Sequence, residues 1–290
     1  MQTVTDPEAA ALWAEAATAR TRAEALCQGC GWYHGLWPEL RALGVVSGAD
    51  GDGAVLSACL AERLCRGARR VLISGAADSG LYGVAKAGGV AKAGIEQAGG
   101  GAVSLVALDL CATPLALIAA RAARDGLALT TERCDILAYE GAPFDVILAH
   151  SFLNQFPPEG KRALLAGWRR LLRPGGHVLT STRLRPLHDP GVRRVRSAAE
   201  IAAFVDKARV AAQARGYGPQ ALRALLPRVQ TFAERQGGWS LIDTHSLRTL
   251  FGEAGFTVVD LRSGAVVGDR AAFGTADAAS TRVQVVAKAV

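Results

Sequence analysis

The sequence predicts an α/β fold with a seven-stranded, mostly parallel, doubly wound sheet and an antiparallel last strand. Three observations lead to this fold class. Short apolar segments alternate with helical patterns from about residue 69 onward, as in βαβ units. The last two apolar segments have no helix between them, so they are expected to pair antiparallel. Half of the residues are hydrophobic and 20% are charged, a composition typical of a soluble globular chain.

The elements follow in order along the chain. Residues 6–43 are predicted to be helical after the start signal Asp6-Pro7, with an aromatic interruption, GWYHGLWPEL, at 31–40. A further helix, AVLSACLAERLCRG, runs up to Arg69. Five parallel strands are then expected at 70–76, 104–110, 127–135, 144–152 and 176–184.

The remaining third of the chain predicts a helical insertion and the end of the sheet. Helices are expected over roughly 197–236, and a helix capped by Gly255 leads into strands at 257–265 and 281–290. The predicted organisation is therefore an N-terminal helical segment or lid, a sheet domain interrupted by a helical cap over the substrate, and the return of the sheet. The corresponding ranges are 1–68, 69–184 with 240–290, and 185–239.

Charge and apolar patterning limit the class of protein. No apolar run reaches the roughly 18–20 residues that span a bilayer, and the N-terminus lacks a signal pattern, so a cytoplasmic location without membrane partners is expected. The net charge of +7 invites a nucleic-acid partner, but only five of the 33 basic residues are lysine. Arginine in an alanine-rich chain reflects coding bias equally well. No aromatic-interleaved basic motif is present, so nucleic acid is disfavoured.

Six cysteines allow one short metal-binding motif. Cys27 and Cys30 form a CxxC pair, and His34 adds a third potential ligand. A structural zinc site normally needs four ligands, and no second CxxC or HxxxH partner exists. The sequence therefore predicts reduced thiols and no metal.

Polar residues stand where the predicted strands end. Ligands of open α/β sheets bind at the carboxyl ends of strands. Asp109 ends the second strand and could accept two hydrogen bonds from a ribose diol, while Asp135 could accept from an exocyclic amine beside Ile136, which could pack on a purine. The fourth strand ends at His150 and Ser151. Each residue alone is typical of a helix cap or turn, but acids after two successive strands favour a nucleoside site.

The glycine-rich segment after the first strand matches neither common phosphate loop. It contains no Gly-Lys pair of a Walker A loop, and the spacing Gly75, Gly80, Gly83 is not G-x-G-x-x-G. The hexapeptide GVAKAG occurs twice, at 83–88 and 89–94. We expect this duplication to extend a helix or its trailing loop away from the ligand.

The order of these motifs resembles the class I S-adenosylmethionine-dependent methyltransferases. The resemblance covers 69–184 well and 240–290 in outline. It is carried by VLISGAADSG, VALDLCATPL, CDILAYE and FDVILAHSFLNQFPPEGKRALLAGWRRLLRPGGHVLTSTRL. It implies S-adenosyl-L-methionine as cofactor, bound through the following residues: Gly75, Ala76, Asp78, Gly80, Asp109, Leu110, Asp135, Ile136, His150 and Ser151.

The first motif departs from the family pattern. Ile73 stands where the family has an acid, Ala77 and Ser79 replace two glycines, and Gly80 comes one position late. Asp78 is the acid nearest to the missing one. These departures leave open a non-catalytic or non-methylating nucleoside-binding relative on the same scaffold. An NAD(P)-dependent oxidoreductase is disfavoured by the absent pyrophosphate fingerprint.

The acceptor side of the site is predicted from residues outside the core strands. Candidate bases or acceptor-orienting residues are His150, Tyr33, His34, His245, Asn154 and Gln155. Five arginines within 183–196 suit an acidic acceptor, although a solvated basic face is an alternative. The expected partner is a small molecule or a peptide, and a homodimer is possible because such sheets often associate through their helices.

Overall fold

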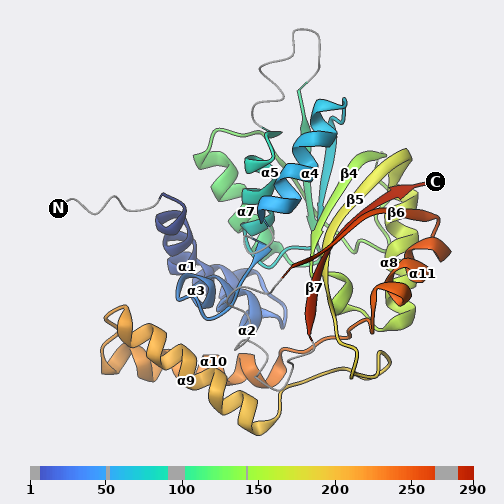
Figure 1. The fold of residues 1–290 in the computed structure, drawn as a ribbon. Coiled ribbons are helices and arrows are strands. Elements are labelled where there is room, and N and C mark those ends of the chain that lie inside the picture. The colour runs from blue at the N-terminus through green and yellow to red at the C-terminus, as the bar shows by residue number, and fades with distance from the viewer. Residues whose placement is uncertain (1–6, 50–52, 91–101, 142, 265–279) are drawn as a thin grey trace.

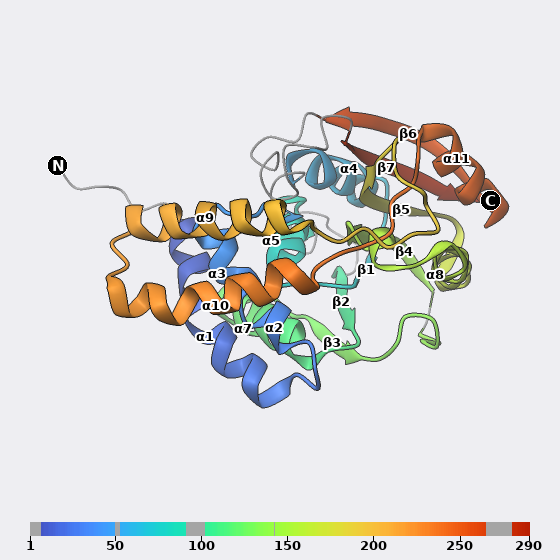
Figure 2. The same ribbon diagram turned by 90° about the horizontal axis from the view of Figure 1, so that it is seen from below.

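The strands form one sheet with the predicted topology. The computed structural model describes residues 7–49, 53–90, 102–141, 143–264 and 280–290. Within them the strand order is β3-β2-β1-β4-β5-β7-β6 (Figures 1 and 2), with β7 antiparallel to both β5 and β6 and the other pairs parallel. The predicted fold class is confirmed. The strands are β1 (Arg70–Ser74), β2 (Ser104–Asp109), β3 (Thr130–Arg133), β4 (Phe144–His150), β5 (Leu172–Leu184), β6 (Phe256–Gly264) and β7 (Thr281–Ala289).

The helices flank this sheet and extend beyond its carboxyl edge. They are α1 (Pro7–Leu26), α2 (Gly31–His34), α3 (Trp37–Ala42), α4 (Gly53–Cys65), α5 (Gly80–Ala87), α7 (Ala112–Arg124), the short 3-10 turn η2 (Leu153–Gln155), α8 (Pro158–Leu171), α9 (Ala198–Ala214), α10 (Pro219–Arg235) and α11 (Thr244–Glu253). No helix within the described residues is long and apolar enough to cross a membrane.

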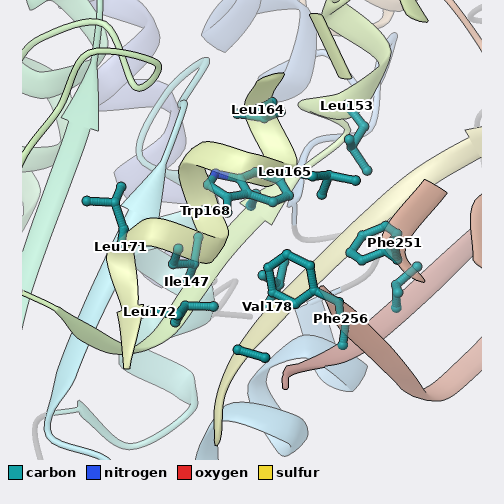
Figure 3. Packing of buried hydrophobic residues seen from close by; sticks show 14 of the residues in the cluster. Ile147, Leu153, Leu164, Leu165, Trp168, Leu171, Leu172, Val178, Phe251 and Phe256 are labelled. Atoms are coloured by element: carbon teal, nitrogen blue, oxygen red, sulfur yellow. The ribbon is translucent and has the colours of Figure 1, made fainter. Parts of the chain in front are cut away.

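Alternate residues of the central strands pack on opposite faces of the sheet. In β4, Ile147 joins a core cluster with α8 and α11, whereas Leu148 joins a second cluster with α4, α5 and α7. Figure 3 shows the first cluster, where Trp168 of α8 lies near Ile147. Trp168 is fully buried, and its indole N–H donates to Ser74 Oγ at 2.9 Å, so its one polar atom is satisfied. The sheet is thus covered on both sides.

A third apolar cluster lies away from the sheet. Residues of α2 and α3 pack against α9 and α10, with Phe204 and Phe232 fully buried between them. Figures 1 and 2 show α9 and α10 running beside the N-terminal helices at the carboxyl end of the strands. A capping box between Ser197 and Glu200 starts α9, which fixes where the insertion leaves its loop. Segments far apart in sequence therefore build one wall over the strand ends.

One predicted interruption is wrong. The aromatic stretch at 31–40 is mostly helical, and the break after α1 falls at 27–30 instead. The stretch forms α2 and most of α3, with a turn at 35–36. The aromatic side chains favour this because they are shared between the two short helices and α10. The second GVAKAG copy, at 89–94, lies mostly outside the described residues, so the prediction about the duplication stays a prediction.

Asp145, the acid at the second position of β4, lies at the end of the sheet opposite to the predicted ligand edge. Its carboxylate accepts hydrogen bonds from the backbone N–H groups of Arg69 and Arg70, at 2.7 and 2.8 Å. It also forms an ion pair with Arg173 at 2.7 Å. This acid of the β4 motif therefore joins β1, β4 and β5.

Candidate active site

A cavity of about 370 Å³ opens at the carboxyl ends of β1, β2 and β4. Its floor is formed by the strand ends, and its walls come from the N-terminal helices and from the segments around the helical insertion. Of the residues predicted for the site, it is lined by Tyr33, His34, Gly75, Ala76, Asp78, Asp109, His150, Ser151, Asn154 and Gln155. The fold thus brings together residues from four separate stretches of the chain, 33–34, 75–78, 109 and 150–155.

The turn after β1 is shaped by Gly75. Its φ of +73° is in the left-handed region, which glycine adopts without strain. A Cβ at this position would come within 2.5 Å of the Phe152 ring. Any larger residue would therefore collide with the loop after β4, and the close approach of these two loops depends on glycine.

Asp109 connects the turn after β1 with the loop after β2. Its Oδ2 accepts the Ala76 N–H at 2.8 Å, and its Oδ1 accepts the Cys111 N–H at 2.7 Å. Burial raises the pKa of this carboxyl group above its ordinary value of 3.8, while the two N–H donors oppose the shift. A carboxylate has about four lone-pair sites, so both oxygens can still accept ribose hydroxyl groups.

These residues fit the nucleoside part of S-adenosyl-L-methionine. Asp109 lines the cavity, at the position where the sequence predicts the ribose-binding acid. Gly75 lets the backbone turn close to the ligand edge. The contacts of this chain to the cofactor remain a prediction.

The atypical loop after Gly75 is held by the N-terminal helices. Asp78 is buried and forms an ion pair with Arg41 of α3. Glu15 of α1 accepts hydrogen bonds from the Ser79 backbone N–H, at 3.0 Å, and from its hydroxyl group. Burial raises the pKa of Glu15, and the nearby Asp78 charge adds to the shift. Asp78, the sequence candidate for the missing acid, thus also fastens the loop to α3.

His150 and Ser151 lie at the end of β4 as predicted. Arg282 Nη1 lies 3.0 Å from His150 Nε2, and because arginine only donates, Nε2 is the acceptor. The remaining ring nitrogen then carries the proton. Ser151 has a φ of +51°, the only positive value among the described residues other than glycine. Strained backbone of this kind often occurs at functional sites.

Aromatic rings form the outer wall. The ring of Tyr33 stacks on Phe232 at 5.6 Å between centroids and on Trp37 at 5.3 Å. Burial raises the pKa of the Tyr33 phenol far above its ordinary value of 10, and the charges of Asp78 and Asp109 add to the effect. Tyr33 therefore stays protonated and can donate a hydrogen bond, but it is a poor base. His34 is 8% exposed and lies 3.7 Å from Cys27 Sγ through Nδ1.

Asn154 is occupied by structural hydrogen bonds. Its amide nitrogen donates to the carbonyl groups of Trp239 and Arg183, at 3.0 and 3.3 Å. Its oxygen accepts from the Arg183 N–H at 3.0 Å and from the Thr182 hydroxyl at 3.1 Å. All four hydrogen-bonding positions of the amide are used. Asn154 thus positions β5 and the end of the insertion rather than offering its amide to an acceptor.

Several predicted residues do not line the cavity. Gly80 begins α5, and Leu110 and Asp135 are exposed outside the cavity. Asp135 Oδ1 accepts the Leu137 N–H at 2.9 Å, as in a turn. Ile136 is 3% exposed and belongs to the core cluster with Trp168, so little of its surface is left for an adenine ring. His245 lies in α11 beside a different, smaller cavity.

The cavity also has residues that sequence reasoning missed. Phe152 and Phe232 supply apolar walls, and Arg282 supplies charge. Arg282 had one usable signal, since a basic residue stood inside the apolar segment TRVQVVAKAV. The others had no local signal, because their meeting depends on the packing of α2, α10 and the loop after β4.

Five arginines surround the cavity. Four of them, Arg183, Arg185, Arg196 and Arg282, are less than a tenth exposed, and Arg193 stands with them at the wall. The sequence had singled out Arg194 as well, but the structure pairs it with Glu200 at the start of α9. The lining carries two acids, Asp78 and Asp109, and Asp78 is paired with Arg41. The cavity therefore has a net positive lining.

Comparisons with known proteins agree with this architecture. Residues 85–176 match the model of a family described as a methyltransferase domain. The 1,6-didemethyltoxoflavin-N1-methyltransferase of Burkholderia thailandensis, solved with its acceptor and S-adenosylhomocysteine, has a similar fold. It shares 20% identity at a TM-score of 0.50, over 94% of this chain and 89% of that one.

Weaker structural similarity extends to two further proteins. The magnesium protoporphyrin IX methyltransferase of Synechocystis PCC 6803 has 14% identity and a TM-score of 0.45 over 83% and 84% of the two chains. The [4+2]-cyclase SpnF has 14% identity and a TM-score of 0.45 over 81% and 79%. No curated protein matches the sequence at a significant level.

The sheet order and the domain match agree on one fold. The oxidoreductase alternative has no support among these findings. The chain has the fold of the class I S-adenosylmethionine-dependent methyltransferases, and its residues 85–176 match a methyltransferase domain.

Proposed function

We propose that this protein transfers the methyl group of S-adenosyl-L-methionine to a small anionic molecule with a flat or apolar part. The five arginines that line one cavity carry this proposal. Guanidinium groups bind carboxylate and phosphate oxygens through paired hydrogen bonds. Clustered charges of one sign in a recessed site also raise the local concentration of the opposite ion. A peptide acceptor is less favoured, because a volume of about 370 Å³ suits small ligands.

The aromatic wall supports the apolar part of the acceptor. Trp32, Tyr33, Trp37 and Phe232 line the same cavity as the arginines. Rings of this kind provide flat apolar surface and exclude water. An acceptor with one charged end and one planar or aliphatic end would satisfy both walls.

The mechanism requires little acid–base chemistry from the protein. When bound, S-adenosyl-L-methionine supplies a methyl group already activated by its sulfonium centre. Asp109 binds the ribose hydroxyl groups, and the arginines hold the acceptor and lower its pKa, so it binds deprotonated. His150 orients the acceptor through the ring N–H that faces away from Arg282. The aromatic wall keeps water out of the reacting region.

Methyl transfer with labelled cofactor tests the acceptor class. We expect transfer to carboxylates and phosphates over their amides and neutral esters. Arg185→Gln should raise the KM of an anionic acceptor roughly 10- to 100-fold, because it removes one charge-assisted hydrogen bond. Arg209→Gln is the matched control, because Arg209 is an exposed residue of α9 paired with Asp206. Arg185→Lys, which keeps the charge, should recover part of the loss and excludes simple misfolding.

A separate binding measurement tests the cofactor. Calorimetry with S-adenosylhomocysteine should show binding to the parent protein and binding to Asp109→Ala weakened roughly 10- to 100-fold. Equal affinity of the two proteins would refute the assignment of Asp109. Methylation of neutral analogues at the same rate as anionic acceptors would refute the proposed acceptor class. Cofactor binding without transfer to any acceptor would instead support a non-methylating relative. The homodimer remains a prediction.

A further inference from the structure

Four metal-ligand side chains meet beside the cavity. They are Cys27, just after α1, Cys30 and His34 at the two ends of α2, and Cys111 between β2 and α7. Their ligand atoms all lie within 4.8 Å of one another. Among the residues that the structure describes, no other group of cysteine, histidine and acidic side chains has its ligand atoms this close together. The sequence offered only three of the four, because Cys111 lies 77 positions beyond His34.

The spacing of the donors matches the edges of a small tetrahedron. Cys111 Sγ lies 3.5 Å from both Cys27 Sγ and Cys30 Sγ, and His34 Nδ1 lies 3.7 Å from Cys27 Sγ. Zinc–sulfur and zinc–nitrogen bonds of about 2.3 and 2.0–2.1 Å give tetrahedral edges of about 3.5–3.8 Å. Three of the six donor separations therefore match these edges, and the other three are no longer than 4.8 Å.

The local structure explains why these four side chains converge. Cys30 and His34 are four residues apart across one helical turn, so they share a face of α2. Cys27 precedes Cys30 by the short CxxC spacing that suits one metal ion. Cys111 is fixed by its own backbone N–H, which donates to Asp109 at 2.7 Å. The ligands therefore come from two parts of the chain, the segment 27–34 and the residue before α7, which lie next to each other.

The surroundings suit bound thiolates. The Thr113 hydroxyl lies 3.0 Å from Cys27 Sγ and is fully buried, as expected of an outer-shell partner that orients a ligand. Cys111 is the residue before α7, a helix of 13 residues whose positive end faces it. His34 and Cys111 are each 8% exposed, so water competes little for the site.

We propose that Cys27, Cys30, His34 and Cys111 bind one Zn²⁺ in a closed structural site that fastens the N-terminal helices to the loop bearing Asp109. Each thiol that binds releases its proton to solvent as the metal–sulfur bond forms. Four protein ligands leave no open position, so the ion supports structure rather than acting on the acceptor. An iron–sulfur cluster is disfavoured, because its iron and sulfide atoms would hold the thiolates farther apart than observed.

The site gives His34 and Cys30 a role in the cavity that does not depend on the acceptor. Both residues line the cavity, and Asp109 lies two positions before Cys111. The metal would therefore hold the aromatic wall and the ribose-binding acid at a fixed separation. His34, as a ligand, is removed from the candidate bases.

Metal analysis of the full chain tests the proposal. Protein produced with zinc and purified under reducing conditions should contain about one zinc per chain by elemental mass spectrometry. Cobalt in its place should show the visible bands of tetrahedral cobalt with thiolate ligands. Cys30→Ser and Cys111→Ser should lose the metal. Cys65→Ser and Cys134→Ser should keep it, because these two cysteines lie outside the cluster.

Two further variants separate metal binding from folding. His34→Cys retains a four-donor set and should keep zinc, whereas His34→Ala should lose it. Thr113→Val should weaken zinc binding roughly 10- to 100-fold while the circular dichroism spectrum stays unchanged. Proteolysis of the zinc-free protein should begin in the N-terminal helices, at a higher rate than in the zinc-bound protein.

The outcome is independent of the proposed reaction. Asp109→Ala should lose affinity for S-adenosylhomocysteine and keep its zinc, so the two proposals can fail separately. The metal site is refuted if the zinc-supplied protein carries no metal and its cobalt form lacks thiolate bands. It is also refuted if reduced, metal-supplied protein contains a disulfide among Cys27, Cys30 and Cys111.

Discussion

Ser151 has a strained backbone conformation that contacts with its surroundings stabilise. Ser151 adopts a positive φ of 51° at the end of β4, where its N–H donates to the Ser181 carbonyl at 2.9 Å. Such backbone costs roughly 1–3 kcal/mol and persists when neighbouring contacts over-determine it. Because Ser151 lines the cavity, the strain coincides with the proposed site of acceptor and cofactor.

Lys161 of α8 provides a prediction about stability at this scale. It is 2% exposed, and its ammonium group donates to the Phe156 carbonyl at 2.6 Å. Burial lowers its pKa from 10.5 to about 8. Between these values the unfolded chain holds a proton that the folded chain has lost, so stability rises with pH from about 8 to 10.5. Below that window the protein carries the whole cost of the buried charge.

Lys161→Met should therefore stabilise the protein near pH 7 by about 1–2 kcal/mol, the burial cost less one hydrogen bond. The gain should shrink as the pH approaches 10. Urea denaturation from pH 6 to 10 measures it. Arg162→Met is the control, because Arg162 is 61% exposed and should show no such pH dependence. If the free energy of unfolding rises by the same amount at every pH, the effect does not come from the buried charge.

Among the elements, the turn between β1 and α5 depends most on its neighbours. This turn contains Asp78 and Ser79, and these side chains contact Arg41 of α3 and Glu15 of α1. The N-terminal helices thus replace, through charge and hydrogen bonds, the order that a tighter glycine turn would give. Arg121 of α7 adds a hydrogen bond to the Ser79 hydroxyl at 3.2 Å.

A double-mutant cycle tests this dependence. Asp78→Asn alone should destabilise the protein by about 3–5 kcal/mol, because it leaves the buried Arg41 charge without its carboxylate. Arg41→Met with Asp78→Asn should lose less than the sum of the single changes, with a coupling energy of roughly 1–3 kcal/mol. Chemical denaturation measures each variant.

The matched control is the exposed pair Arg209–Asp206 of α9, where we expect a coupling below about 1 kcal/mol. The side chains of that pair are 43% and 59% exposed, whereas those of Arg41 and Asp78 are each 5% exposed. Equal coupling in the two pairs would contradict a special role for the buried one.

The whole molecule consists of a two-faced sheet core and a separate apolar cluster that closes the cavity. Phe251 lies in the core on one face of the sheet, and Phe232 lies in the third cluster, where it also lines the cavity. Both are fully buried. Substitutions at these two phenylalanines therefore distinguish an effect on stability alone from an effect on acceptor binding.

Phe232→Leu and Phe251→Leu should each cost roughly 1–3 kcal/mol of stability, because each opens a cavity of similar size. Only Phe232→Leu should also raise the KM of the acceptor, by roughly tenfold, since it moves the aromatic wall. Thermal denaturation and steady-state kinetics measure the two effects. An equal change of KM in both variants would argue that the third cluster has no specific part in acceptor binding.

The sequence by itself determined the periodic features of this protein. The apolar strands, the helices between them, the antiparallel end of the sheet and the positions of Asp109 and His150 follow from local patterns. Residues within a few positions share one helix face or one strand, so their spacing carries this information. The cofactor family followed from the order of motifs at the strand ends.

Tertiary structure decided which distant side chains meet. The burial of Ile136 under α8, the Asn154 network, the Arg282–His150 contact and the approach of Cys111 to Cys27 had no local signal. Each depends on how two elements dozens of residues apart pack, and packing is a property of the closed core rather than of any short segment. The strands could be read from the sequence, but the cavity and the candidate zinc site exist only once the chain has folded.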